Sequence, residues 1–185
     1  MMPGWEMVRI MKSVAILLLS LVLLSACHQR PAVHTGKGFS VVPPNEKIYV
    51  VPFTTVMVPR EVEEGIFDQF VDALNAEGAA DRYEFVILKQ DLSTIDKDWL
   101  ADHYYLTGDL FAYVEESGCC ATTIRSRSRL KLFQPGQPEP TLVMEYPREI
   151  FFEHDYSNIL VQRRRLATDI ATTLAQKLLK SLAGS

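Results

Sequence analysis

The sequence predicts an α/β domain: a mixed β-sheet of about five strands with about three helices packed on it. Strand-like and helical segments alternate along residues 47–182, three long strand-like segments follow one another, and an amphipathic helix closes the chain. The 185 residues are 48% hydrophobic and 23% charged, a globular composition. We expect a signal peptide over residues 1–26, a flexible tether over 27–46 and a single domain over 47–185.

Each element in the first half of the domain has its own pattern. A short β-branched and aromatic run that closes with proline predicts a strand over residues 47–53. An apolar stripe at helical spacing then predicts a helix that Gly78 ends. Residues 83–88 predict a second strand, and residues 93–102 predict a short helix. The stripe of the first helix consists of Val62, Ile66, Phe70 and Leu74.

The second half of the domain is dominated by strands. Strand-like segments cover residues 104–115, 122–133 and 141–152. Residues 134–140 contain a Pro-Gly pair and further prolines, which mark a hairpin loop, so the strands on either side are antiparallel. A helix over residues 157–182 ends the domain. Its apolar stripe contains Ile159, Leu166, Ile170, Leu174 and Leu178.

The N-terminal segment has the order of a secretory signal. Arg9 and Lys12 precede an apolar run that is shorter than the roughly 20 residues a membrane span needs. Leu24-Ser25-Ala26-Cys27 then resembles the bacterial lipoprotein processing site. This resemblance implies that Cys27 carries three acyl chains, palmitate among them, and that they anchor the protein to a membrane. The alternatives are an ordinary secretory signal and a retained signal anchor.

Residues 27–46 are rich in proline, glycine and polar side chains and show no period, which indicates a tether. We expect His28 and His34 to be solvated there. In enterobacterial lipoproteins, an aspartate directly after the acylated cysteine retains the protein in the inner membrane. His28 holds that position here, and the resemblance therefore implies the outer membrane, with the domain facing the periplasm.

Two short motifs resemble those of a known superfamily. Residues 48–53, IYVVPF, resemble its opening V-x-P-F strand, and residues 104–109, YYLTGD, resemble its Y-L-T-G third strand. The superfamily contains the TolB amino-terminal domain, the curli secretion-channel lipoprotein and the lipoprotein activator of penicillin-binding proteins. The resemblance implies a TolB amino-terminal-like sandwich that acts as a noncatalytic binding or assembly module of the cell envelope. The chain has no room for the membrane hairpins of the curli channel, and Cys119-Cys120 is not part of the pattern.

Four cations alternate with other residues in the second of the long strands. Because side chains alternate across a strand, all four are expected on one face of the sheet. They are Arg125, Arg127, Arg129 and Lys131. One interpretation is a basic strip that contacts an anionic partner. The alternative is a solvated face whose cations pair across strands with Asp109, Glu115, Glu145 or Glu149.

Cys119 and Cys120 are the thiols that remain once Cys27 is acylated. Adjacent Cα atoms lie about 3.8 Å apart, below the usual disulfide span of about 4.4–6.8 Å, so a vicinal disulfide would be strained. The alternatives are free or intermolecularly paired thiols, and a metal or redox site. The last is disfavoured because no histidine lies at ligand spacing.

The acid–base residues form no recognisable catalytic set. His103 and His154 have aspartates beside them in sequence, which is not the spatial arrangement of a relay, and no nucleophile elbow or phosphate loop occurs. We expect His103 to be a packed edge residue and residues 163–165, three arginines, to form a solvated helix turn that could instead contact anionic lipid. No metal or cofactor is implied.

These observations predict a lipid-anchored periplasmic lipoprotein that binds a cell-envelope protein complex as a noncatalytic accessory or assembly component. The net charge of −4, about −5 without the signal, lacks the basic footprint of nucleic-acid-binding proteins, so no nucleic acid is expected. The alternatives are an oligomeric export or secretion-channel component and an envelope enzyme with an unrecognised site. Exposed sheet edges would favour a homo-oligomer.

Overall fold

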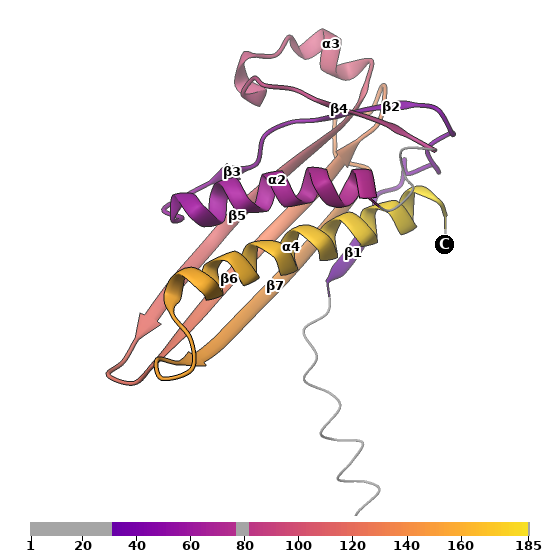
Figure 1. Cartoon of the computed structure of the whole chain (residues 1–185). Coiled ribbons are helices and arrows are strands. Elements are labelled where there is room, and N and C mark those ends of the chain that lie inside the picture. The colour runs from indigo at the N-terminus through magenta and orange to yellow at the C-terminus, as the bar shows by residue number, and fades with distance from the viewer. Residues whose placement is uncertain (1–30, 77–81, 185) are drawn as a thin grey trace, which may run out of the picture. The chain divides into compact units, whose positions relative to one another are not determined.

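A seven-stranded sheet forms the framework of the domain (Figure 1). The computed structural model describes residues 31–76 and 82–184. The strands lie in the order β1-β7-β6-β5-β2-β4, and β3 pairs with β5 beside this path. They are β1 (Ala32–Thr35), β2 (Lys47–Val50), β3 (Thr54–Thr55), β4 (Glu84–Ile87), β5 (Tyr104–Ser117), β6 (Ala121–Phe133) and β7 (Leu142–Glu153). The helices are α2 (Arg60–Ala76), the 3₁₀ turn η3 (Leu92–Thr94), α3 (Lys97–Ala101) and α4 (Ile159–Leu182).

The sheet is mixed, as the sequence predicts. β2 pairs in parallel with β4 and β5, and β3 also runs parallel to β5. β5, β6 and β7 form an antiparallel meander, and β1 adds to the far edge of β7 in the antiparallel sense. The α/β class is therefore confirmed. The sheet has two strands more than the expected five, because the short β1 and β3 were not anticipated.

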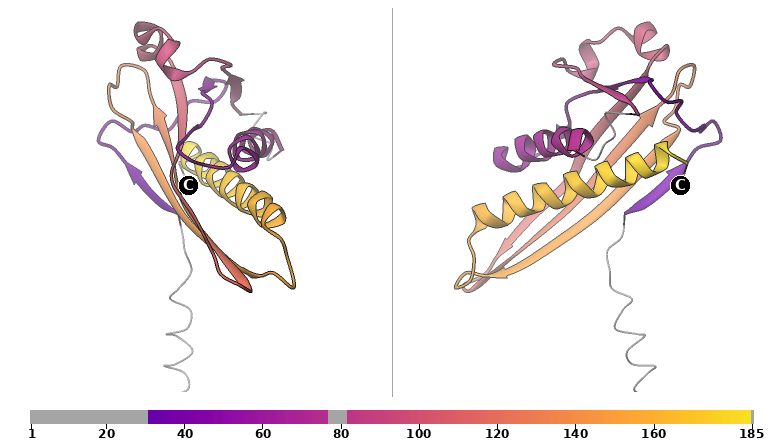
Figure 2. Two further views of the ribbon diagram at one scale, coloured as in Figure 1. Left: turned by 90° about the vertical axis from the view of Figure 1, so that its left-hand side faces the viewer. Right: turned by 45° about the vertical axis from the view of Figure 1, so that its right-hand side comes forward.

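Both long helices pack on the same face of this sheet (Figure 2). The predicted stripe of α2 is fully buried, and so is most of the stripe of α4. β5, β6 and β7 contribute the apolar side chains that meet them, among them Leu106, Leu130 and Met144. Polar groups on this face are paired: Ser128 Oγ donates to the Tyr146 carbonyl at 3.1 Å. Gly78, the expected helix stop, lies outside the described residues.

The tether boundary at residue 46 is wrong. β1 pairs with β7 from Ala32 to Thr35, and Val42 is buried in the core. Gln134 further holds this segment, because its Nε2 donates to the Ser40 carbonyl at 2.7 Å. Every side chain of β1, His34 included, is exposed, so the strand is held by main-chain hydrogen bonds and leaves no alternating pattern in the sequence. The part of the expected tether before residue 31 lies outside the described residues.

The two motifs that suggested the superfamily lie on neighbouring parallel strands. Val51 donates its N–H to the Leu106 carbonyl at 3.0 Å, and Phe53 lies over Gly108. A Cβ added at Gly108 would lie 2.4 Å from two ring carbons of Phe53. The ring is itself confined by Phe67 and Phe70, at centroid distances of 5.8 and 5.2 Å. The glycine therefore makes room for the aromatic ring that joins β5 to α2.

We expect Gly108→Ala to lower the free energy of unfolding by about 1–3 kcal/mol, because the new methyl overpacks a confined ring. Urea unfolding followed by circular dichroism measures the change. Gly118→Ala is the matched control, since its Cβ would lie 3.5 Å from the nearest atom, an ordinary contact. Phe53→Leu should relieve the overlap that Gly108→Ala creates, so the double variant should lose less stability than the sum of the two single variants. A loss equal to that sum would contradict this packing.

Candidate functional site

The face of the sheet opposite α2 and α4 has no long helix over it in the described chain (Figure 2). Only the short α3 lies near it, where Trp99 and His103 pack on Tyr49 of β2. The rest of the face belongs to the three long strands, and we call it the open face. It is the surface where the predicted basic strip should lie.

The four predicted cations all lie on the open face. Along β6, the buried residues of the helix side alternate with Arg125, Arg127, Arg129 and Lys131, which are exposed or half-buried. The pairing of strands places Pro147 of β7 on one side of Arg127 and Ala112 of β5 on the other. The period-2 argument is therefore correct about the geometry, and contact with an anionic partner stays a prediction.

Most of these cations already have carboxylate partners on adjacent strands. Arg125 contacts Glu116 at 2.8 Å and Glu149 at 3.2 Å, and these contacts raise its pKa. Arg129 contacts Glu145 at 3.0 Å, and Lys131 contacts Asp109 at 3.4 Å. The Arg125 pairs are solvent-exposed and screened by salt, whereas the Lys131–Asp109 pair is partly buried.

Arg127, by contrast, makes no ion pair with any residue in 31–76 or 82–184. It stands between two paired arginines with apolar neighbours on both sides.

Glu115, expected among the partners of the strip, faces the other side. The register of β5 shifts between Leu110 and Ala112, so Phe111 is an extra residue in the strand. One extra residue reverses which side chains face which way, and Glu115 therefore turns toward the helices, leaving Glu116 to pair with Arg125. Phe111 itself lies beneath Arg129, whose guanidinium carbon is 4.5 Å from the ring centroid.

On the helix side, Glu115 binds Arg163 of α4 in a bidentate pair. Nε and Nη2 of Arg163 donate to the two carboxylate oxygens at 2.7 and 2.9 Å, and Tyr113 donates its hydroxyl to the same carboxylate. The arginine lowers the pKa of Glu115, and Glu115 raises that of Arg163. Burial, with the carboxylate beside it, raises the pKa of Tyr113. Arg163 is thus no solvated residue of the helix turn, whereas Arg164 and Arg165 are exposed.

His103 and His154 are held by local contacts. His103 stacks on Trp99 at a centroid distance of 4.2 Å, and its Nδ1 lies 2.6 Å from the Trp99 carbonyl, so it is the packed edge residue that we expected. His154 Nε2 lies 2.8 Å from Thr122 Oγ1. Among the described residues, no group of three or more histidine, cysteine or acidic side chains is placed to hold a metal ion.

Cys119 and Cys120 form the turn between β5 and β6. Gly118 donates its N–H to the Ala121 carbonyl at 2.8 Å and closes the turn, and both thiols are free and exposed. Their Sγ atoms are 3.0 Å apart, and this contact raises the pKa of Cys120. The Cys120 thiol therefore remains mostly protonated at neutral pH. The state of both thiols in the cell stays a prediction.

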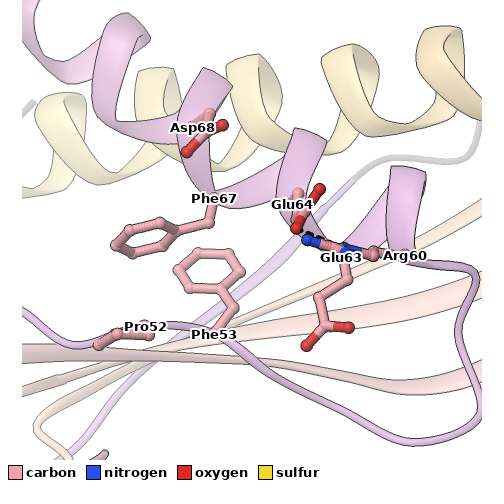
Figure 3. A pocket seen from close by; sticks show the side chains of 7 residues that line it. All are labelled: Pro52, Phe53, Arg60, Glu63, Glu64, Phe67 and Asp68. Carbon is pink, nitrogen blue, oxygen red and sulfur yellow. Dashed lines mark hydrogen bonds and ion pairs between the residues drawn. The ribbon is translucent and has the colours of Figure 1, made fainter. Parts of the chain in front are cut away.

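Two open pockets of about 480 Å³ each, which the sequence did not suggest, lie beside α2 and α4. In the first, the rings of Phe53 and Phe67 form an apolar floor, and Arg60 binds Glu64 at 2.7 Å (Figure 3). With Glu63 and Asp68 also at its rim, its chemistry suits a cationic group with an apolar body. The second is lined by residues that include Glu115, Arg163 and His154. Helical periodicity identifies the apolar stripe of α2 and does not show which of its other side chains border a cavity, so it could not reveal the pocket.

Comparisons with known proteins show the fold. No protein-family model and no curated protein matches the sequence. The PelC dodecamer from Paraburkholderia phytofirmans aligns with a TM-score of 0.50 and 13% identity over 78% of this chain and 97% of that one. Protein XCC0632 from Xanthomonas campestris, of the family model DUF330, aligns with a TM-score of 0.50 and 12% identity over 82% and 93%. The chain therefore shares the fold of these proteins. In the described part of the chain, no helix is both long enough and apolar enough to cross a bilayer.

We expect Glu115→Gln to lower the free energy of unfolding by about 1–3 kcal/mol at pH 7, because it removes the bidentate partner of Arg163 and leaves that guanidinium only the more distant Glu61, at 3.8 Å. The pKa of Glu115 is lowered in the folded state. The pair therefore stabilises the fold fully above the ordinary glutamate pKa of about 4.3, and this contribution is lost as the pH falls through the lowered pKa. Urea unfolding at pH 7 and pH 3 measures both values, with Glu116→Gln as the exposed control. A difference from wild type that stays constant with pH would contradict the assignment.

We expect both thiols of the turn to react with iodoacetamide in the absence of reductant, because adjacent Cα atoms lie below the usual disulfide span. Intact mass spectrometry of the folded protein should show two adducts on Cys119 and Cys120. Pretreatment with a reductant is the control and should leave that number unchanged. Adducts that form only after reduction would instead identify a disulfide, within this turn or between molecules.

Proposed function

We propose that this protein is a lipid-anchored lipoprotein of the periplasmic side of the outer membrane, which binds a cell-envelope protein complex as a noncatalytic accessory component. The anchor follows from the Leu24-Ser25-Ala26-Cys27 pattern, and His28 after the cysteine favours the outer membrane. Acylation at Cys27 would confine the domain to a surface and raise its effective concentration near a membrane-bound partner. The resemblance to the TolB-like superfamily supports the same class of role.

The observation that carries the proposal is the open face. Its centre is an arginine, Arg127, with no ion pair in the described chain, and exposed apolar side chains lie on both flanking strands. Val114 of β5 and Phe151 of β7 are 49% and 63% exposed, and Phe111 lies beside Arg129. Arginine with aromatic and aliphatic neighbours is typical of the energetically important part of a protein interface. A partner with a carboxylate at its centre would complement Arg127.

A binding role also fits the local contacts in which the titratable side chains of the domain are engaged. His103 is held by Trp99 and His154 by Thr122, and Glu115 is engaged by Arg163 and Tyr113. These contacts stabilise the fold and leave each group in a structural role. The proposal therefore assigns no reaction to the domain.

In-cell crosslinking followed by mass spectrometry tests the proposal. Wild type, Cys27→Ser and Arg127→Glu/Arg129→Glu are compared with Lys89→Glu/Lys177→Glu, which changes the same amount of charge at exposed positions off the open face. We expect wild type and the lysine control to capture the same envelope complex. Loss of the anchor or reversal of the strip should reduce capture by about tenfold or more, since charge complementarity governs such contacts.

The arginine double variant must retain the circular dichroism spectrum and melting temperature of wild type for this comparison to count. Equal capture by the wild type and the arginine double variant would remove the strip from the interface. Equal capture by Cys27→Ser would remove the anchor from the mechanism.

A second candidate function is an oligomeric component of an export or secretion channel. The shared fold with PelC, which forms a dodecamer, favours it. The outer edge of β7 also extends well beyond the four residues that pair with β1, and unpaired edges favour self-association. In the crosslinking experiment this function predicts ladders of the protein with itself, and native mass spectrometry of the purified protein would give the number of copies.

A further inference from the structure

One end of the domain is apolar on both of its sides. We call it the tip and define it as residues 114–123, which contain the β5–β6 turn, and residues 151–161, which join β7 to α4 (Figure 1). Phe151 is 63% exposed and Tyr156 is 85% exposed, and about half of the surface of each other apolar member is exposed. These others are Val114, Leu160 and Val161, and the thiols of Cys119 and Cys120 add two small, weakly polar groups.

The tip is a firm structure, because its two segments are hydrogen-bonded to each other. His154 donates its N–H to the Cys120 carbonyl at 2.9 Å, and its ring bonds Thr122 at 2.8 Å. Asn158 caps α4 by accepting from the Val161 N–H at 3.0 Å. The apolar side chains are therefore presented on a preformed surface, and exposing them to water is unfavourable unless something covers them.

β1 points the chain that precedes it toward this end of the domain. β1 runs antiparallel to β7, and Ala32 lies opposite Glu145, so the chain before Ala32 approaches from the side on which β7 ends, which is the tip. Five peptide steps separate Cys27 from Ala32, and they span at most about 17 Å. Glu153, the last residue of β7, lies eight residues beyond Glu145, or about 27 Å along the strand. Because 17 Å is less than 27 Å, Cys27 and the tip reach the same bilayer surface when the strands lean by roughly 50° or more from the membrane normal.

The charges of the tip suit a bilayer surface. Glu153 and Asp155 are exposed on the connection after β7, and Arg164 and Arg165 are exposed in the first turns of α4. Arg164 and Arg165 lie just beyond the tip and balance these two carboxylates, and Glu115 and Glu116 are paired with Arg163 and Arg125. Neither strong repulsion from anionic headgroups nor dependence on them is therefore expected. Tyrosine, phenylalanine and branched aliphatic side chains are those that favour the interface between lipid and water.

We propose that the tip is a lipid-contact surface, on which the domain stands against the bilayer that holds its anchor. This inference rests on the proposed acylation of Cys27. The end of the domain that carries α3, at the opposite end of β5, then points away from the membrane. The open face stays accessible to a neighbouring protein on the same membrane. The occupant is lipid, because the chain before Ala32 points toward the tip and ties the domain within about 17 Å of the acylated Cys27.

Fluorescence quenching on the full-length lipoprotein tests the orientation. The protein is purified from membranes and reconstituted into vesicles of phosphatidylethanolamine and phosphatidylglycerol, some of which carry a nitroxide on the acyl chain. A bimane probe is attached to Cys120 in Cys119→Ser, or to a new cysteine in Ser93→Cys/Cys119→Ser/Cys120→Ser, at exposed η3 near α3. We expect the nitroxide to quench the Cys120 probe about twofold or more and to leave the Ser93 position unaffected.

A second pair of variants connects the quenching to the apolar side chains. Phe151→Glu/Leu160→Glu places charges on the tip, whereas Ile87→Glu/Leu92→Glu changes two comparably exposed apolar residues near α3. We expect the first pair to abolish quenching at Cys120 and the second pair to leave it unchanged. Both variants should keep the melting temperature of wild type, since the substituted side chains are partly solvated.

The outcomes separate the orientation from the anchor. A protein that stays in the membrane fraction and incorporates labelled palmitate, yet shows no quenching at Cys120, would overturn the lipid contact and leave the proposed function intact; the tip would then be available to a protein partner. Equal quenching at both positions would overturn the orientation. A soluble protein whose Cys27 reacts with the probe would overturn the anchor, and the lipid contact with it.

Discussion

The burial of a single face of the sheet under α2 and α4 is the constraint on which the rest of this structure depends. The two long helices are amphipathic, and both place their apolar stripes on the same side of β5, β6 and β7. β6 must therefore alternate between apolar or hydroxyl side chains that face the helices and charged side chains that face water. The open face is charged because the core lies entirely on the other side.

One extra residue in β5, Phe111, changes which side chains of that strand face the helices. Without the bulge at Phe111, Glu115 would lie with Asp109 on the open face, and Arg163 of α4 would lack its bidentate carboxylate partner. With it, Glu115 reaches Arg163 and Glu116 takes the pairing position beside Arg125. The bulge thus divides the acidic residues of β5 between the two faces. It also sets Phe111 beside Arg129, which gives the charged strip an apolar neighbour.

The open face and the tip divide the surface between two kinds of contact. The strip on β6 is polar, partly paired and extended, as expected of a surface that meets another protein reversibly. The tip is smaller and more apolar, and it lies on the side from which the chain joins the domain at Ala32. Membrane contact and partner binding would therefore use adjoining parts of one sheet: Val114 and Phe151, at one end of the open face, also belong to the tip, whereas Arg127 lies outside it.

Local patterns in the sequence determined the class of fold, the buried stripe of α2 and the common face of Arg125, Arg127, Arg129 and Lys131, because each depends on a period of 3.6 or 2 within one segment. The same reasoning missed β1, whose exposed side chains carry no period, and it placed Glu115 on the wrong face, because a bulge changes the period without marking the sequence. Tertiary structure alone decided that Arg163 binds Glu115, that Phe53 requires a glycine at position 108, and that exposed side chains from distant segments meet at the tip. These features join residues that are far apart in the chain, and their contacts depend on strand register and helix placement, which only the packed domain specifies.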